Sequence, residues 1–208
     1  MAEQIQIESI RSETISIPII GTSPLIVHNF SEKSKRQMLE AQQGKKKIKD
    51  VRDPEAEYLA AFYRIATDDG EAYGFPVTAF KAATVGAARF WKGLKMTELR
   101  QCMFFHGIYT DADPQQLVEI KGEARMREDV VRLAGPSRSA DLRYRPEFPE
   151  WRADLKVTFV ETSLSRESVL SLVDAGGMGV GIGEWRPEKK GEFGTYKIDP
   201  DRDIEVVG

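Results

Sequence analysis

One short segment, DLKVTFVE at residues 154–161, constrains the fold most strongly. Its apolar side chains Leu155, Val157 and Phe159 alternate with polar ones, which is typical of a strand with one buried face. Ser165 then has the position of an N-cap, and it predicts a helix over residues 166–174. Further strands are predicted at residues 5–20, 103–109, 117–120, 194–198 and 204–207. Further helices are predicted at residues 32–43, 54–70, 79–90 and 94–102, and Thr78 is the predicted N-cap of the third of these. This order predicts one α+β domain with insertions over residues 1–208.

Composition excludes several classes of protein. The single cysteine, Cys102, cannot form an internal disulfide, so a secreted disulfide scaffold is excluded. The N-terminal segment lacks the pattern of a signal peptide, and no apolar run reaches the length of a membrane span. We therefore expect a soluble, cytoplasmic protein that does not contact membranes. The net charge of −3 argues against a uniformly basic binder but leaves room for a local basic groove.

Charge is distributed unevenly along the chain. Residues 30–52 contain eight Lys or Arg against three acids, and within them residues 44–53 are expected to form an inserted basic loop. That loop is either a solvated hairpin or a segment that folds over a bound strand. Residues 125–152 contain seven arginines, no lysine and five acids, and residues 121–150 are expected to be irregular. Arginine favours phosphate contacts more than lysine does, because its planar guanidinium group matches phosphate oxygens and stacks on bases.

The most distinctive stretch is GGMGVGIGEWRPEKKGEFG at residues 176–194. Its glycines leave backbone N–H groups uncovered, so that a phosphate backbone can approach closely. It lacks the ending of a Walker loop and is a poor dinucleotide fingerprint. A structural bend between a helix and a strand is the alternative interpretation. The phosphate-binding interpretation is favoured by the neighbouring cations and indole, and it assigns contacts to Gly179, Gly181, Gly183, Trp185, Arg186, Lys189 and Lys190.

A second set of candidates precedes this stretch. The arginines of SRSADLRYRPEF, Arg138, Arg143 and Arg145, are candidate phosphate contacts, and Arg143 and Arg145 have pairing with Asp141 and Glu147 as the alternative. Tyr144, Trp151 and Trp185 are candidates for stacking on bases, with core packing as the alternative for Tyr144 and Trp151.

Taken in order, the chain resembles the RAMP superfamily, the ferredoxin-like RNA-binding subunits of CRISPR effector complexes. In that family an aromatic-Pro-Gly-Ser-Ser-Leu-Lys-Gly segment opens a helix, and Phe75-Pro76-Val77-Thr78-Ala79-Phe80-Lys81 corresponds to it here. The late glycine-rich segment corresponds to the family's C-terminal glycine loop. Val77, Ala79 and Ala82 depart from the family's Gly, Ser and Gly. The segment GIGEWRPEKKGEFG favours a phage-encoded relative over a mainstream effector subunit.

The resemblance implies a ferredoxin-like or RRM-like antiparallel sheet with helices on one face. It also implies non-catalytic binding of single-stranded nucleic acid, with RNA favoured over DNA. Thr78 and Lys81 would then contact phosphate. The expected partners are single-stranded RNA or DNA, further copies of the chain stacked along the strand, and other effector subunits.

Two other functions remain open. Some processing endonucleases of the superfamily place a general-base histidine early in the chain, so His28 supports a metal-independent endoribonuclease as an alternative. A phage structural or interaction module, whose glycine loop forms only a protein interface, is the third hypothesis. We expect no metal and no cofactor, because the sequence contains none of the common metal-ligand or phosphate-loop motifs.

Overall fold

The computed structural model describes residues 9–29, 36, 38–40, 42–44, 52–67, 70–110, 113–132 and 140–207. The predicted basic loop 44–53 lies for the most part outside the described residues, as does Arg138. The strands are β1 (Ser12–Gly21), β2 (Leu25–Ile26), β3 (Tyr63–Thr67), β4 (Gly70–Pro76), β5 (Met103–His106), β6 (Ile108–Thr110), β7 (Asp113–Ile120), β8 (Arg125–Arg132), β9 (Ala140–Phe148), β10 (Arg152–Val160), β11 (Tyr196–Ile198) and β12 (Glu205–Val206). The helices are α2 (Pro54–Ala60), α3 (Val77–Gly86), α4 (Met96–Cys102) and α5 (Arg166–Gly179), with 3₁₀ turns η1 (Ala87–Phe90) and η2 (Pro187–Lys189).

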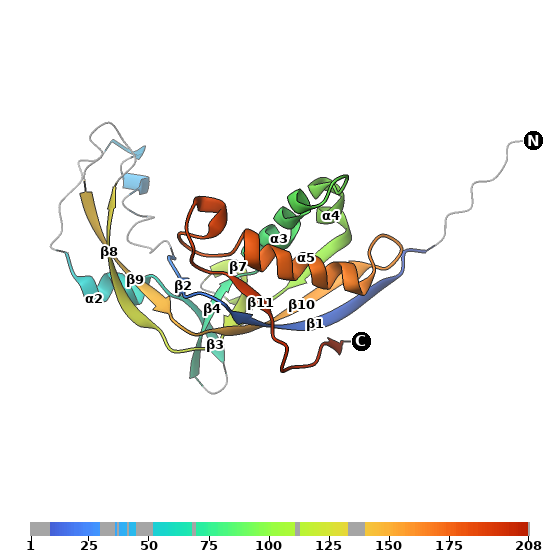
Figure 1. Ribbon diagram of the computed structural model, residues 1–208. Helices are drawn as coiled ribbons and strands as arrows, with labels where there is room; N and C mark the ends of the chain where they lie inside the picture. The colour runs from blue at the N-terminus through green and yellow to red at the C-terminus, as the bar shows by residue number, and fades with distance from the viewer. Residues whose placement is uncertain are drawn as a thin grey trace, which may run out of the picture.

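The central sheet has the strand order β11-β1-β10-β5, and β12 also pairs with β1. All of its pairs are antiparallel. Helices α3 and α5 pack against each other, and Figure 1 shows them on one side of β1 and β10. Two β-α-β units, β1-α3-β5 and β10-α5-β11, thus interlock in the manner of a ferredoxin-like domain. The predicted α+β class, with an antiparallel sheet and helices on one face, is confirmed.

The core forms because alternate strand residues point toward the helices. Ile15 pairs with Val157 and Ile17 pairs with Leu155, and all four side chains are fully buried. The predicted strand at 154–161 and its N-capped helix are both confirmed, since the Ser165 side chain accepts a hydrogen bond from the Ser168 N–H.

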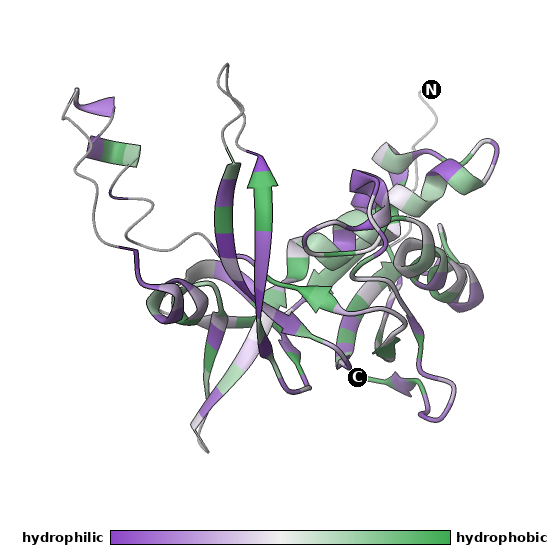
Figure 2. Ribbon diagram, turned by 60° about the vertical axis from the view of Figure 1, so that its left-hand side comes forward, coloured by the Kyte–Doolittle hydropathy of each residue, from purple (hydrophilic) through white to green (hydrophobic). Residues whose placement is uncertain are grey.

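Two smaller sheets flank this core, one with the order β3-β4-β7-β6 and one with the order β2-β9-β8. The β8–β9 ribbon extends away from the body of the molecule, as Figures 1 and 2 show. Aromatic rings anchor its base: Phe62 stacks on Tyr73 with ring centroids 4.3 Å apart, and both meet Phe148 edge-on.

The prediction that residues 121–150 are irregular is wrong, because residues 125–132 and 140–148 pair as β8 and β9. The two strands lack clean apolar alternation because their charged side chains pair with one another. The single helix expected over 54–70 is also wrong. It ends at Ala60, and the next residues form β3, where Tyr63 and Ile65 pair with Gly74 and Ala72 of β4.

The glycine-rich segment begins inside a helix, because α5 continues to Gly179. A Cβ atom at Gly176 would meet the backbone carbonyl of Ala83, so this glycine permits the close approach of α5 and α3. Thr78 is not the N-cap that the sequence predicted: the cap is Pro76, and Thr78 lies in the first turn of α3.

None of the described helices combines the length and the apolar character that a membrane span needs.

Candidate functional site

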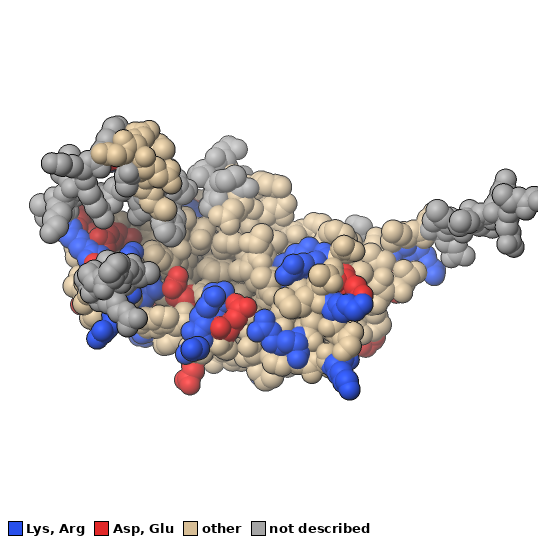
Figure 3. All heavy atoms as spheres, turned by 90° about the horizontal axis from the view of Figure 1, so that it is seen from above, with Lys and Arg blue, Asp and Glu red and all other residues tan. Residues whose placement is uncertain are grey.

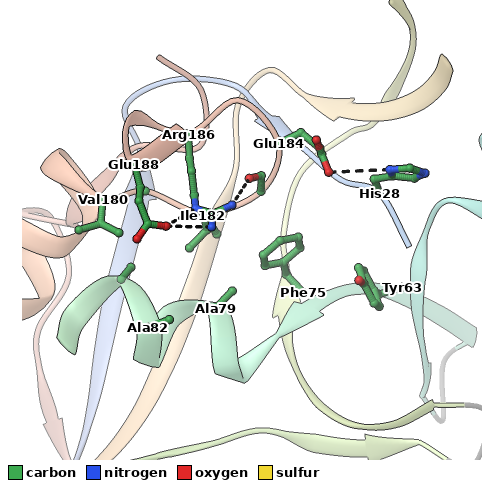
Figure 4. A pocket seen from close by; sticks show the side chains of 13 residues that line it. His28, Tyr63, Phe75, Ala79, Ala82, Val180, Ile182, Glu184, Arg186 and Glu188 are labelled. Atoms are coloured by element: carbon green, nitrogen blue, oxygen red, sulfur yellow. Dashed lines mark hydrogen bonds and ion pairs between the residues drawn. The ribbon is translucent and has the colours of Figure 1, made fainter. Parts of the chain in front are cut away.

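A groove lies between the start of α3 and the glycine loop, which we define as residues 180–194. The groove encloses a cavity of about 220 Å³. Phe75, Ala79 and Ala82 line one wall, and Val180 to Glu184 together with Arg186 line the other (Figure 4). Tyr63 and His28 lie at one end, and Glu188 lies at the other. Two segments that are about a hundred residues apart in the sequence therefore form the opposite walls of one site.

The glycine loop owes its shape to backbone hydrogen bonds with β2 and with itself. The Glu184 N–H donates to the carbonyl of Ile26, and the Gly194 N–H donates to that of Pro24. Gly183 has φ +75°, and a Cβ there would overlap the Ile26 carbonyl oxygen, so only glycine fits this turn. Trp185 adopts φ +52°, a strained conformation for a large side chain. Within the described chain, the Gly183 and Trp185 N–H groups have no acceptor, whereas most other amides of the loop are bonded.

His28 and Glu184 form a pair at one end of the groove. The imidazole Nδ1 lies 3.8 Å from the Glu184 carboxylate. His28 is the largest influence that lowers the pKa of Glu184, with smaller contributions from Arg145 and Arg186, while burial acts in the opposite direction. The carboxylate is therefore held ionised beside the imidazole, and both side chains line the groove.

Arg186 crosses the other end of the groove. Its guanidinium donates to the carbonyl of Gly183 at 3.1 Å and to the Glu188 carboxylate at 2.9 Å. Arg89, in η1 directly after α3, approaches the same carboxylate at 3.5 Å. Arg186 lowers the pKa of Glu188 through this hydrogen bond. The groove lining thus contains two carboxylates, Glu184 and Glu188, and one guanidinium, Arg186. Arg89 adds a second cation beside Glu188, and the exposed Lys189 and Lys190 follow Glu188 in the sequence.

A buried charge network joins the glycine loop to the β8–β9 ribbon. Arg145 is 3% exposed and donates to Asp129 at 2.6 Å, and it also approaches Glu184 at 3.4 Å. Arg127 donates to Glu147 and to Asp129, both at 2.8 Å. The guanidinium carbons of Arg127 and Arg145 lie 5.3 Å and 5.1 Å from the centre of the Trp185 ring, which is cation–π geometry. The network holds the strained tryptophan in place.

The structure brings only some of the predicted site residues together. Gly181, Gly183 and Arg186 line the groove, with His28 beside them. Arg145 is not placed to contact phosphate, because it is buried in the network. The alternative prediction that Arg145 pairs with Glu147 is also wrong, since Glu147 pairs with Arg125 and Arg127.

Other predicted residues lie elsewhere. Gly179 is helical, and a Cβ there would overlap the ring of Phe90, so it belongs to a packing contact. Lys81 points away from the groove, since its ammonium donates to the Arg100 carbonyl at 3.1 Å and lies over the Phe104 ring. Thr78 is exposed beside the groove without lining it. Arg143 lies on the ribbon and pairs with Asp141 at 3.2 Å, as its alternative interpretation predicted.

The three stacking candidates also differ. Trp151 is 2% exposed and is a core residue, as its alternative interpretation predicted. Tyr144 is half-buried on β9, where the Arg52 guanidinium lies 5.9 Å from its ring centre. Trp185 is half-buried in the network with the arginines described above.

Sequence reasoning missed Tyr63, Arg89, Arg127 and the two glutamates of the groove. Tyr63 was placed in a helix, and ion pairs between distant segments leave no pattern in a sequence. Glu184 was detectable, since it lies inside the glycine segment and directly precedes Trp185. Among the described residues, no group of three His, Cys, Asp or Glu side chains is arranged to hold a metal ion.

By sequence, the chain matches no protein family profile and no curated protein. By backbone, it is similar to the crystal structure of Cmr6 from Pyrococcus furiosus, over 92% of this chain and 100% of that one, with 11% identity and a TM-score of 0.41. This similarity in backbone is partial.

Proposed function

We propose that this protein binds single-stranded nucleic acid, with RNA favoured over DNA, along the groove between α3 and the glycine loop. The single observation that carries the proposal is the meeting of the start of α3, through Phe75 and Ala79, with the glycine loop as opposite walls of one groove. A phosphate backbone placed there meets a helix N-terminus on one side and close-packed glycine backbone on the other. The preference for RNA rests on the sequence resemblance.

Helix α3 supplies the first anion-binding element. It is ten residues long, and its N-cap, Pro76, provides no side-chain hydrogen bond to the first turn. The N–H groups of that turn, together with the helix dipole, favour a negative charge. Phe75 and Ala79 place this turn against the cavity.

The glycine loop supplies the second element. The unbonded N–H groups of Gly183 and Trp185 are donors for a phosphate oxygen. Arg186 is 30% exposed and already lies in the groove, so a phosphate can exchange with Glu188 for its guanidinium. Lys189 and Lys190 add positive charge next to Glu188, and neither forms a close ion pair with an acid in the described chain. Arg143 on the ribbon remains a candidate contact farther along.

Binding is expected to be sequence-tolerant and strongly dependent on salt, because backbone phosphates supply most of the interaction. The test is fluorescence anisotropy with labelled single-stranded RNA and DNA at a series of salt concentrations. In the Lys189→Gln, Lys190→Gln double variant we expect weaker binding of every sequence and a salt slope smaller by about 1.4, which corresponds to two lost phosphate contacts on a single strand. Lys156→Gln is the matched control, since Lys156 is exposed on β10. No complex at low salt and micromolar protein would falsify the proposal.

Copies of the chain are proposed to assemble along a bound strand, in company with other effector subunits. Size-exclusion chromatography before and after nuclease treatment tests this assembly. Species that shrink to monomers after treatment support it. Species that persist unchanged show that protein contacts alone hold the copies together, as the structural-module hypothesis requires.

A second candidate function is favoured by the His28–Glu184 pair. An imidazole paired with a carboxylate can remove the proton from a ribose 2′-OH, whose oxygen then attacks the adjacent phosphorus to form a 2′,3′-cyclic phosphate. The bond from phosphorus to the 5′-oxygen breaks, and that oxygen takes up a proton from the imidazolium or from water and leaves as a 5′-OH. Incubation of labelled RNA hairpins with EDTA tests this activity in the parent and in His28→Ala. Cleavage by the parent alone supports it, and equal cleavage or none removes it.

A further inference from the structure

An exposed aromatic pair marks a second surface outside the groove. Phe90, the last residue of η1, is 50% exposed, and Trp91 after it is 42% exposed. Their rings meet edge-on with centroids 6.4 Å apart. Contiguous exposed apolar surface with a polar border is a feature of binding sites. We call Phe90 and Trp91 the aromatic platform.

The platform is fixed to the helical layer. The Phe90 ring fills the space that a side chain at Gly179 of α5 would occupy. The Trp91 N–H donates to the carbonyl of Ala88 at 3.1 Å. The Phe90 ring and the Trp91 backbone are therefore held in position before any ligand arrives, which lowers the entropic cost of binding.

Positive charge surrounds the platform. Residues 89–95 contain Arg89, Lys92 and Lys95 and no acid. Lys95 pairs with Glu98 at 2.8 Å, whereas Lys92 is exposed and has no acidic partner in the part of the chain that the structure describes. Figure 3 shows Lys and Arg in several groups over the helical side of the molecule, with acidic side chains between them.

The platform also continues the groove. Arg89, its first neighbour, approaches Glu188 of the glycine loop at 3.5 Å. Lys189 and Lys190 follow Glu188 directly, so cations run from the rim of the groove to Trp91. A strand that leaves the groove at Glu188 therefore meets the platform next.

Beyond Trp91, a cavity of about 500 Å³ separates the 91–94 turn from the first two turns of α5. Trp91, Leu94 and Leu172 give it apolar walls, and Glu167, Ser168 and Ser171 give it a polar edge. A volume in this range accommodates small organic groups. Flat apolar walls with hydroxyl and carboxylate groups at one edge match the face and the edge of an unstacked base.

We infer that the aromatic platform and this cavity form a second site for the bases of single-stranded nucleic acid, extending the proposed groove toward α5; the inference rests on the proposed function. Bases stack on Trp91 and Phe90 while Lys92 and the loop lysines contact phosphates. A polyanion is favoured over a protein partner because Lys92 beside the rings and the two loop lysines form no ion pair with an acid in the described chain.

The test compares oligonucleotides of graded length, from about 4 to about 16 nucleotides, on the full chain. Trp91→Ala should leave the affinity for the shortest oligonucleotides unchanged and weaken the longest roughly tenfold, the effect of losing one stacked base. Trp91→Phe should restore most of that affinity, because a benzene ring still stacks. Met178→Ala is the control, since Met178 is 70% exposed on α5 and has no ring; it should bind like the parent at every length.

Each result separates this site from the groove. If Trp91→Ala and the parent bind long oligonucleotides equally while short ones still bind, the second site is overturned and the groove stands. If Trp91→Ala alters self-association in sedimentation without altering affinity, the platform is a protein interface and the inference is overturned. If no oligonucleotide of any length binds the parent, the proposed function fails and the second site fails with it.

Discussion

Two tryptophans show how differently two regions of this protein are held together. Trp151, in the central sheet region, is 2% exposed, and its indole N–H donates to the Ser23 carbonyl at 2.9 Å. Trp185, in the glycine loop, is half-buried, has a positive φ and lies under two guanidinium groups. The first is held by burial of apolar surface and the second by charge. The scaffold should therefore tolerate changes of salt and pH, whereas the groove should respond to them.

The comparison is tested most strongly at the core tryptophan. Trp151→Ala should lower the free energy of unfolding by about 4 kcal/mol, since truncation of a buried aromatic leaves a cavity and an unpaired Ser23 carbonyl. Urea unfolding at low and at high salt measures it. We expect the same loss at both salt concentrations. A loss that changes strongly with salt would mean that charge, rather than burial, dominates the region.

The second largest loss of stability is expected on substitution of Arg145, the buried arginine of the charge network. Arg145→Met should cost about 3 kcal/mol, because it leaves the buried Asp129 carboxylate without its closest partner. The control is the double variant Arg145→Met, Asp129→Leu, in which no unpaired charge remains from this pair and most of the stability returns. If the double variant is no more stable than the single one, the loss reflects packing and not an uncompensated charge.

The core of the fold was predictable because a strand with one buried face has apolar residues at every second position of the sequence. Leu155, Val157 and Phe159 alternate with polar residues, and their partners on β1 do the same, so both strands were identified. The helix expected through Ile65 failed because Tyr58, Phe62 and Ile65 also fit helical spacing. Only the pairing of β3 with β4, a tertiary contact, decides between the two patterns.

The site was predictable where it depends on glycine and was not where it depends on charge. Gly181 and Gly183 were identified, because turns with positive φ demand glycine. The pairing of Arg145 with Asp129 joins residues sixteen positions apart on neighbouring strands, and no periodic pattern in the sequence predicts it. The same holds for Glu184, whose partners come from β9 and from the segment after β2.

A smaller effect is expected at the loop tryptophan. Trp185→Ala should cost about 1–2 kcal/mol through loss of the cation–π contacts while the strained backbone remains. Trp185→Gly also loses the ring but relieves the strain, so it should be more stable than Trp185→Ala by about 1 kcal/mol. Equal stability of the two variants in urea unfolding would show that the positive φ stores no strain.

The smallest effect concerns pH. The pKa of Glu184 is lowered in the folded protein, so its carboxylate stabilises the fold at pH values above its ordinary pKa, about 4.3, and this stabilisation is lost as the pH falls through the lower folded value. The side chain is 40% exposed, and solvent screening therefore limits the effect to below about 1 kcal/mol. Glu184→Gln should be less stable than the parent at neutral pH, and the difference should vanish in acid.

Glu192→Gln is the matched control, because Glu192 is an exposed residue of the same loop with no ion pair to another described residue. Its stability should follow that of the parent at every pH. If the difference between the parent and Glu184→Gln stays constant from neutral pH to acid, Glu184 acts through its shape and its hydrogen bonds rather than its charge. The loop would then be held like the core, and the contrast between the two tryptophans would be one of exposure alone.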